Sequence, residues 1–420
     1  MEFSIDSEIT GLPFDLDSMS RRTAKIELYL TRNSCEEINK LYLCNLPNFP
    51  SEKFLKTYNS LEISTKNIPW PLCMSKEVYQ QEIKDFIKAT REVLVNDCTD
   101  DFSYYLGWFK QGQKIYDAIR PVKINQGAFD QAVSENPTDM VLGSFKPNIK
   151  TGFAYLPEYS RVDTITGRLK IIKGPQILHL RKAHRNKIFE SRFGTGGKVY
   201  EFDYKCLEPR VLLALKGTKN IPVDIYTYAL KELFPEHPNL DRQRIKQILL
   251  TRLYGGSLGE LETLSMPVST SSQFDKSILS PRPLSVDVID SVGEALEEFF
   301  GVKELRSRLV GENRSNCIKS HYGRVVSTLQ ARNSILVNYF TQSTAMTVAE
   351  LGFSKIVNKL EDKGLLHSKV FPLFVLTDAL YMDIDNSVED RVVSMVKEEG
   401  SMNIPLFDGD VKFHLDANSL

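Results

Sequence analysis

Two aspartates stand where apolar strand patterns end. Asp203 closes the alternating segment V-Y-E-F-D, and Asp378 lies inside an apolar run at 370–384 that predicts two strands hinged at Thr377, Asp378 and Ala379. Carboxylates that a sheet brings together repel each other, and a divalent cation relieves the repulsion. Such a pair suits two-metal phosphoryl transfer. The structural alternative is that each acid only forms a turn or caps an element.

A helix pattern at 240–253 has basic side chains on one side. Two cations one turn apart could grip a triphosphate, and Lys246 could donate a proton to a leaving pyrophosphate. Tyr254 could provide a ring for base stacking. The alternative is an amphipathic helix whose bases are simply solvated. Four residues recur at every fourth position and therefore lie along one side: Arg242, Lys246, Leu250 and Tyr254.

The charge of the chain is balanced overall but uneven locally. Lys and Arg number 53 and Asp and Glu 54, which does not by itself indicate a polyanionic partner. Between Arg161 and Lys198, however, there are ten basic residues, and the only acidic residues are Asp163 and Glu190. This segment predicts either a nucleic-acid path on one face or a solvated basic loop.

Strands separated by long helical insertions predict an α+β fold in which a small sheet carries the site. The segment 198–205 alternates as a strand and runs into a helix-like stretch. The first 150 residues have helical patterns at 15–43 and 75–94, separated by Pro-rich breaks, and 266–285 predicts an exposed loop.

The composition and the absence of long apolar runs exclude collagenous, disordered, membrane-spanning and secreted disulfide-rich proteins. The 420 residues are 42% hydrophobic and 25% charged, ordinary values for a globular protein. Neither a secretory signal nor a membrane-length apolar run is visible, so a cytoplasmic location is expected. The six cysteines contain no C-x-x-C pair and the six histidines no H-x-x-x-H, which argues against zinc and redox motifs.

These motifs, in this order, resemble those of family A DNA polymerases, and the chain is similar to a divergent phage or mobile-element type. The segment D-Y-K-C-L-E-P-R (203–210) resembles the family's D-Y-S-x-I-E-L-R, and the helix at 240–253 its R-x-x-x-K-x-x-x-F/Y-x-x-x-Y-G. T-D-A at 377–379 stands where the family has H-D-E. Lesser matches are G-L-P-F-D at 11–15, T-G-R at 166–168, P-Q-I-L at 175–178, D-I-Y-T at 224–227, and Asn338 with Gln342.

The resemblance implies a right-hand polymerase architecture with thumb, palm and helical fingers. The helical thumb would span 1–150, the palm 151–223 and 323–420 with a small antiparallel sheet, and the fingers 224–322. The resemblance also implies two Mg²⁺ ions, which Mn²⁺ could replace, held by Asp203, Asp378 and the carbonyl of Tyr204. The incoming nucleotide would be bound by Arg242, Lys246, Tyr226, Leu250, Tyr254 and the steric gate Glu208, and the DNA by Arg168, Arg210, Asn338 and Gln342.

The sequence also departs from the family. Thr377 and Ala379 replace a His and the second acid of the metal hairpin, and Asp383 or Asp385 could compensate for that acid unless both are structural. Tyr226 replaces a His, Leu250 an aromatic residue, and Lys205 a Ser.

The resemblance implies a template-directed DNA polymerase that extends a primer 3′-OH with dNTPs and releases pyrophosphate. The stretch before the palm is too short for a proofreading exonuclease as well as a thumb, so no intrinsic proofreading is expected. Partners would be primer–template DNA, dNTPs and a separate exonuclease or processivity factor, in a bacterial cytoplasm or nucleoid, including that of a phage-infected host. The alternatives are a single-subunit RNA polymerase or primer-synthesising polymerase, or a catalytically inactive DNA-binding relative.

Overall fold

The computed structural model describes residues 3–5, 24–26, 77 and 100–420, apart from 162–163, 238–239, 256–283, 314–316, 329–330, 402–403 and 408–410. The segment predicted at 11–15 and nearly all of the loop predicted at 266–285 lie outside these residues. Of the helical pattern predicted at 15–43 only 24–26 are described, and they form a strand, so the helix prediction is wrong there. Of the pattern at 75–94 only Glu77 is described, and it is helical. The chain divides into two compact units, 1–107 with 323–325 and 108–322 with 326–420. In the first unit, β1 (Phe3–Ile5) pairs with β2 (Ala24–Ile26).

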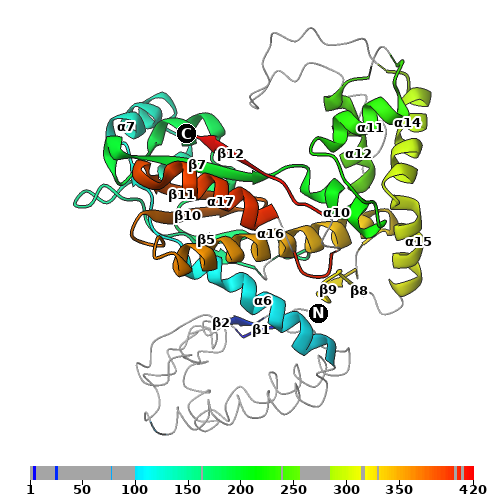
Figure 1. Ribbon diagram of the computed structural model, residues 1–420, viewed down its shortest axis with the longest axis horizontal. Helices are drawn as coiled ribbons and strands as arrows, with labels where there is room; N and C mark the ends of the chain where they lie inside the picture. Colours follow the sequence, from blue (N-terminus) through cyan, green and yellow to red (C-terminus); the bar gives the residue numbers. More distant parts are fainter. Residues whose placement is uncertain are drawn as a thin grey trace, which may run out of the picture. The chain divides into compact units, whose positions relative to one another are not determined.

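A four-stranded antiparallel sheet lies at the centre of the second unit, in the order β10-β11-β7-β12 (Figure 1). The alternating segment at 198–205 forms β7 (Gly197–Tyr204), as predicted. The apolar run at 370–384 forms the expected hairpin of β10 (Val370–Leu376) and β11 (Ala379–Asp385). The outer strand β12 (Leu415–Ser419) pairs with β7 on its other side.

Alternation along β7 separates the two faces of this sheet. Tyr200, Phe202 and Tyr204 belong to the large core on the side of α16 (Leu336–Asp362) and α17 (Glu389–Ser401). Val199 belongs to a second core on the opposite face. Because successive side chains alternate, Asp203 lies on the face away from α16.

The helical layer approaches the sheet closely at one glycine. The Tyr204 hydroxyl donates a 2.7 Å hydrogen bond to the carbonyl of Gly400. A Cβ atom on Gly352 of α16 would overlap the Tyr204 phenol oxygen. Gly352 therefore lets the ring of the residue that follows Asp203 pack against the helix.

A helical region follows β7 along the chain (Figure 1). It contains α10 (Leu207–Leu215), α11 (Ile225–Leu233), α12 (Arg242–Leu253), α14 (Val286–Phe299) and α15 (Val302–Glu312). Asp224, Asp241 and Ser285 cap α11, α12 and α14, each side chain accepting a backbone N–H of the first turn. The prediction of a helix over 240–253 is therefore confirmed, as is the α+β fold class with a small antiparallel sheet.

The remaining elements complete the described chain, in which no helix is both long and apolar enough to cross a membrane. β3 pairs with β6, β4 with β5, and β8 with β9. These elements are α6 (Asp100–Ala118), β3 (Lys123–Ile124), α7 (Gln126–Glu135), α8 (Met140–Gly143), β4 (Glu158–Ser160), β5 (Lys170–Lys173), α9 (Lys182–Ile188), β6 (Phe189–Glu190), β8 (Cys317–Lys319), β9 (Val325–Ser327), and the 3₁₀ turns η2 (Ile177–His179), η3 (Gly194–Gly196), η5 (Asn333–Ile335) and η6 (Asn386–Val388).

Candidate active site

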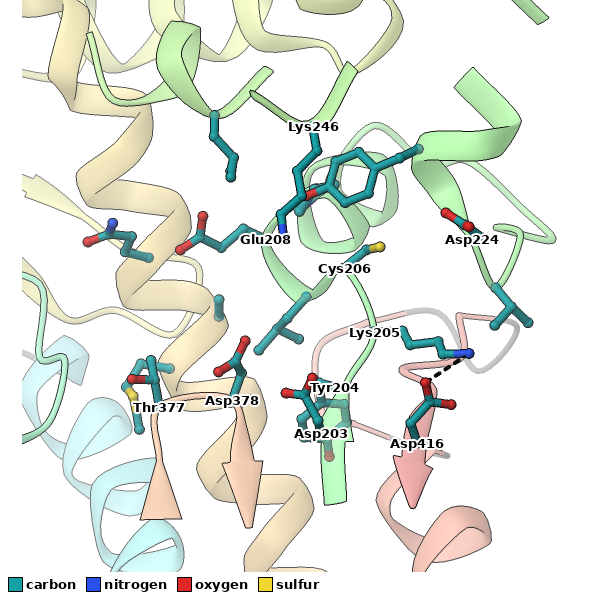
Figure 2. A pocket seen from close by; sticks show the side chains of 18 of the residues that line it. Asp203, Tyr204, Lys205, Cys206, Glu208, Asp224, Lys246, Thr377, Asp378 and Asp416 are labelled. Atoms are coloured by element: carbon teal, nitrogen blue, oxygen red, sulfur yellow. Dashed lines mark ion pairs between the residues drawn. The ribbon is translucent and has the colours of Figure 1, made fainter. Parts of the chain in front are cut away.

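Strand pairing brings Asp203 and Asp378 together at one edge of the sheet. Thr377 and Asp378 form the turn of the β10–β11 hairpin, and Ala379 is the register partner of Asp203. The Tyr204 N–H donates to the Asp378 carbonyl at 2.9 Å, which ties the turn to the end of β7. Figure 2 shows the two carboxylates side by side, both pointing into a cleft. Thr377 has a φ of 45°, which is unusual for a β-branched residue and typical of strained functional turns.

The two carboxylates resist ionisation together. Burial, the charge of Asp378 and the charge of Glu201 raise the pKa of Asp203 to about 7. Asp378 is exposed to the cleft, but the surrounding protein displaces bulk water and raises the pKa of its carboxyl group, while Arg168 and Lys246 act to lower it. In the absence of a cation the pair therefore retains a proton near neutral pH.

The cleft has a volume of about 400 Å³ and lies between the sheet edge and α12. Asp203, Tyr204 and Asp378 form its wall on the side of the sheet, and residues of α12 form the opposite wall. All residues that the sequence assigned to the site line it except Arg210 and Asn338. Those that do are Arg168, Asp203, Tyr204, Glu208, Tyr226, Arg242, Lys246, Leu250, Tyr254, Gln342 and Asp378.

The two cations of α12 that line the cleft are held differently. The Arg242 Nε donates to both carboxylate oxygens of Asp224, at 3.1 and 2.8 Å, and its guanidinium lies 5.4 Å from the Tyr226 ring centroid. This pairing raises the pKa of Arg242 and lowers that of Asp224. Lys246 forms no ion pair with the described residues and points into the cleft (Figure 2). One cation is thus fixed at the rim, and the other is available to a ligand.

Glu208 and Tyr254 meet across the cleft. The Tyr254 hydroxyl donates to Glu208 Oε2 at 3.1 Å, linking the first turn of α10 to the end of α12. Burial raises the pKa of Glu208, and the nearby Arg168 opposes that change. Tyr254 itself is partly exposed, so its ring can still contact a ligand. The Glu208 side chain is consequently held inside the cleft.

The structure places Arg210 and Asn338 away from the cleft. Arg210 is fully buried and donates to the carbonyl oxygens of Ile221, Pro222 and Val223 at 2.8–3.3 Å, so it supports the loop before α11. This position does not suit the DNA contact expected from sequence. Asn338 is also buried, on α16, and its Oδ1 accepts no hydrogen bond from the described residues.

The basic stretch at 161–198 is partly structural. Arg161 is buried and donates to both carboxylate oxygens of Glu350, and Arg192 pairs with Asp383 at 3.2 Å. Arg168, Lys170, Lys173, Arg181, Lys182 and Lys187 are exposed, as is Lys198, which pairs with Glu389 at 2.8 Å. Only this exposed subset can contact a polyanion.

Asp383 and Asp385 are structural rather than substitutes for the missing acid. Asp383 is 1% exposed and accepts from Ser191 Oγ at 2.6 Å and from the Arg192 backbone N–H at 2.7 Å. Asp385 caps η6 and pairs with Lys369 at 2.6 Å.

Three acids near the cleft were given no site role from the sequence, although Asp224 begins the D-I-Y-T match and Glu201 lies in the strand that ends at Asp203. Asp416 is the register partner of Asp203 on β12, opposite the hairpin. Glu201 lies two residues before Asp203 on the same face, bonded to Tyr381 and paired with Lys182 at 2.6 Å. Asp224 holds Arg242. The sequence contains no local signal for these contacts because each depends on the order of strands and helices in space.

Comparisons with known proteins identify the fold. No protein-family model matches the chain, and no curated protein matches it. Among solved structures, the chain is similar to the POL domain of Pol1 from M. smegmatis, solved in complex with DNA primer–template and dNTP. The identity is 13% and the TM-score 0.58, and the match covers 83% of this chain and 75% of that one. The chain thus shares the fold of that polymerase domain.

Proposed function

We propose that this chain is a template-directed DNA polymerase that extends a primer 3′-OH with dNTPs. The observation that supports the proposal most is the cleft itself. It places Asp203 and Asp378 opposite Arg242 and Lys246, on a fold shared with a polymerase domain that was solved with primer–template and dNTP.

The reaction would transfer a nucleotidyl group. The primer 3′-OH gives up its proton to solvent as its oxygen attacks the α-phosphorus of the dNTP. The bond between the α-phosphorus and the oxygen that bridges to the β-phosphate breaks, and pyrophosphate leaves. Arg242 and Lys246, which line the cleft, would compensate the charge of the triphosphate, and Lys246 would donate a proton to the departing pyrophosphate. Catalysis would therefore rest on positioning and electrostatics.

The carboxylate pair fits a divalent cation. Asp203 and Asp378 offer hard oxygen ligands at one edge, with the carbonyl of Tyr204 next along β7. Burial, with the charge of the neighbouring carboxylates as a smaller contribution, raises the pKa of both groups, and a bound cation would offset this cost of ionisation. Mg²⁺, or Mn²⁺ in its place, would be held by these three residues. When bound it would neutralise charge and act as a Lewis acid on phosphoryl oxygens. Lacking the second acid of the hairpin, the chain relies on these two aspartates.

Glu208 favours DNA over RNA synthesis. Its side chain is fixed by Tyr254 in the cleft, where it would fill the space that a ribose 2′-OH needs. A single-subunit RNA polymerase or a primer-synthesising polymerase is the alternative, and rNTP incorporation equal to dNTP incorporation would favour it.

Arg168 and Gln342 are proposed to contact the primer–template minor groove. Both line the cleft, and hydrogen-bond acceptors there are similar for all correct base pairs. Arg210 and Asn338 are less suited because both are buried. Tyr226 and Leu250 line the nucleotide side of the cleft, and Tyr254 would lie near the templating base.

The assignment of thumb (1–150), palm (151–223 and 323–420) and fingers (224–322) is part of the proposal, as are a cytoplasmic location and a phage or mobile-element source. The matched structure is bacterial and does not favour a phage source.

The lack of proofreading and a separate exonuclease or processivity factor also stay predictions. Removal of a mismatched primer 3′ end by the purified protein would contradict the former.

The test is primer extension on a recessed DNA template with Mg²⁺ and dNTPs. The wild type should extend the primer, and Asp203→Asn and Asp378→Asn should each lose at least about 10³-fold in rate because each removes a charge from the reacting centre. Asp385→Asn is the matched control, since Asp385 lies at the other end of the same hairpin, paired with Lys369. Binding of primer–template without extension in Mg²⁺ or Mn²⁺, with dNTPs or rNTPs, would favour an inactive DNA-binding relative.

A further inference from the structure

A second ion pair lies on the palm side of the cleft. Asp416 on β12 is the register partner of Asp203, and Lys205 directly follows β7. The Lys205 Nζ lies 2.9 Å from Asp416 Oδ2, and both side chains line the cleft (Figure 2). The pair is therefore a direct neighbour of the catalytic carboxylates.

This pair is poorly suited to a purely structural role. The Lys205 and Asp416 side chains are 37% and 45% exposed, and ion pairs with this much solvent contribute little to stability. The lysine ammonium is a compact charge on a flexible four-carbon stem, so a stronger anion in the cleft can attract it away from its partner. A polyphosphate carries more charge than one carboxylate.

The charges that line the cleft are unevenly distributed, so one more cation on the side of the sheet would complement a bound triphosphate. Arg242 and Lys246 both approach from α12, whereas the sheet side presents the carboxylates of Asp203, Asp378 and Asp416, with Arg168 as a cation near Asp378. A triphosphate between these walls would face more carboxylates than cations on the side of the sheet. In the sequence motif that 203–210 resembles, a serine occupies the position of Lys205.

We propose that Lys205 is a third cation for the polyphosphate of the incoming nucleotide, and that Asp416 holds its ammonium at the rim until the nucleotide binds. The Asp416 carboxylate and the polyphosphate thus compete for the Lys205 ammonium. This inference rests on the proposed function, because it concerns the same cleft, and it assigns Lys205 to binding of the nucleotide rather than to the chemical step.

The test is isothermal titration calorimetry of the full chain in Mg²⁺ with dATP and with inorganic tripolyphosphate. Lys205→Ala should weaken both ligands about tenfold, the scale of one solvated charge-assisted contact. Lys205→Arg should retain affinity within about threefold, because the charge stays. Asp416→Asn should tighten binding about two- to threefold, because the competing carboxylate is gone. Lys198→Ala should change nothing, since Lys198 lies at the far end of β7, paired with Glu389.

Opposite effects at the two partners are the decisive result, because a structural ion pair would make Lys205→Ala and Asp416→Asn change affinity in the same direction. Equal weakening by both variants, or weaker binding in Asp416→Asn alone, would overturn the inference. Primer extension with the same proteins separates it from the proposed function. A wild type that extends primers while Lys205→Ala binds dATP normally would refute only the role of Lys205. A wild type that binds tripolyphosphate with the expected variant pattern, but extends no primer, would refute only the polymerase.

Discussion

Replacing Asp203 by Asn is expected to stabilise the fold while removing activity. In the folded chain, burial and the neighbouring carboxylates Asp378 and Glu201 raise the pKa of Asp203 from 3.8 to about 7. At about 1.4 kcal/mol per unit, this shift corresponds to at most about 4 kcal/mol of destabilisation when the pH is above 7. Because solvent in the cleft screens these charges, we expect about 2 kcal/mol.

The pH dependence follows from the direction of the shift. A raised folded-state pKa means that the folded chain binds more protons than the unfolded chain between pH 4 and pH 7, so the free energy of unfolding falls as pH rises through this window. Asn cannot ionise. The stabilisation by Asp203→Asn should therefore be near zero at pH 4 and complete above pH 7.

The assay is urea unfolding in EDTA at several pH values, with thermal unfolding as a second measurement. Mg²⁺ should stabilise the wild type more than Asp203→Asn, because the cation binds the ionised pair. Asp385→Asn is the control, because the pKa of Asp385 is shifted in the opposite direction. Pairing with Lys369 lowers it to about 2, so removing the Asp385 charge should not raise the free energy of unfolding. A variant Asp203→Asn less stable than the wild type at pH 7.5, or a gain that is constant with pH, would refute the reasoning.

Three further results are expected. Glu208→Ala should raise rNTP incorporation relative to dNTP by about 10- to 100-fold in single-nucleotide kinetics, because it empties the space beside the sugar; an unchanged ratio would place the gate elsewhere. Lys246→Ala should lower the rate of nucleotide incorporation by about 10²- to 10³-fold in rapid-quench measurements, while Lys246→Arg retains part of it; equal loss in both would contradict electrostatic compensation. Gly352→Ala should cost about 1–3 kcal/mol in urea unfolding because its methyl group meets Tyr204, whereas Gly311→Ala, with open space around it, should not destabilise; equal effects would contradict close packing at α16.

The elements that carry the site could be predicted because their patterns are local. Alternation predicts β7, and an apolar run broken at Thr377 and Asp378 predicts a hairpin, since both signals are read within about ten residues. The spacing of four along α12 likewise places Arg242 and Lys246 on one wall. The resemblance to polymerase motifs then indicated which of these elements would meet.

Contacts between distant elements could not be predicted in the same way. Arg210 stands in a site motif, yet the loop before α11 covers it and uses its donors. Asp416 neighbours Asp203 only because β12 returns to the outer side of β7, and strand order is not visible in the sequence of the last strand. Arg161, in a stretch that suggested a nucleic-acid path, is paired with Glu350 instead.

The most direct test of the central claim is single-nucleotide addition on four templates that differ only in the first unpaired base. With Mg²⁺, the wild type should add only the complementary dNTP on each template and release one pyrophosphate per nucleotide added, and Asp378→Asn should do neither. Addition that ignores the template base, or activity that Asp378→Asn retains in full, would contradict the account of a templated polymerase built on the Asp203–Asp378 pair.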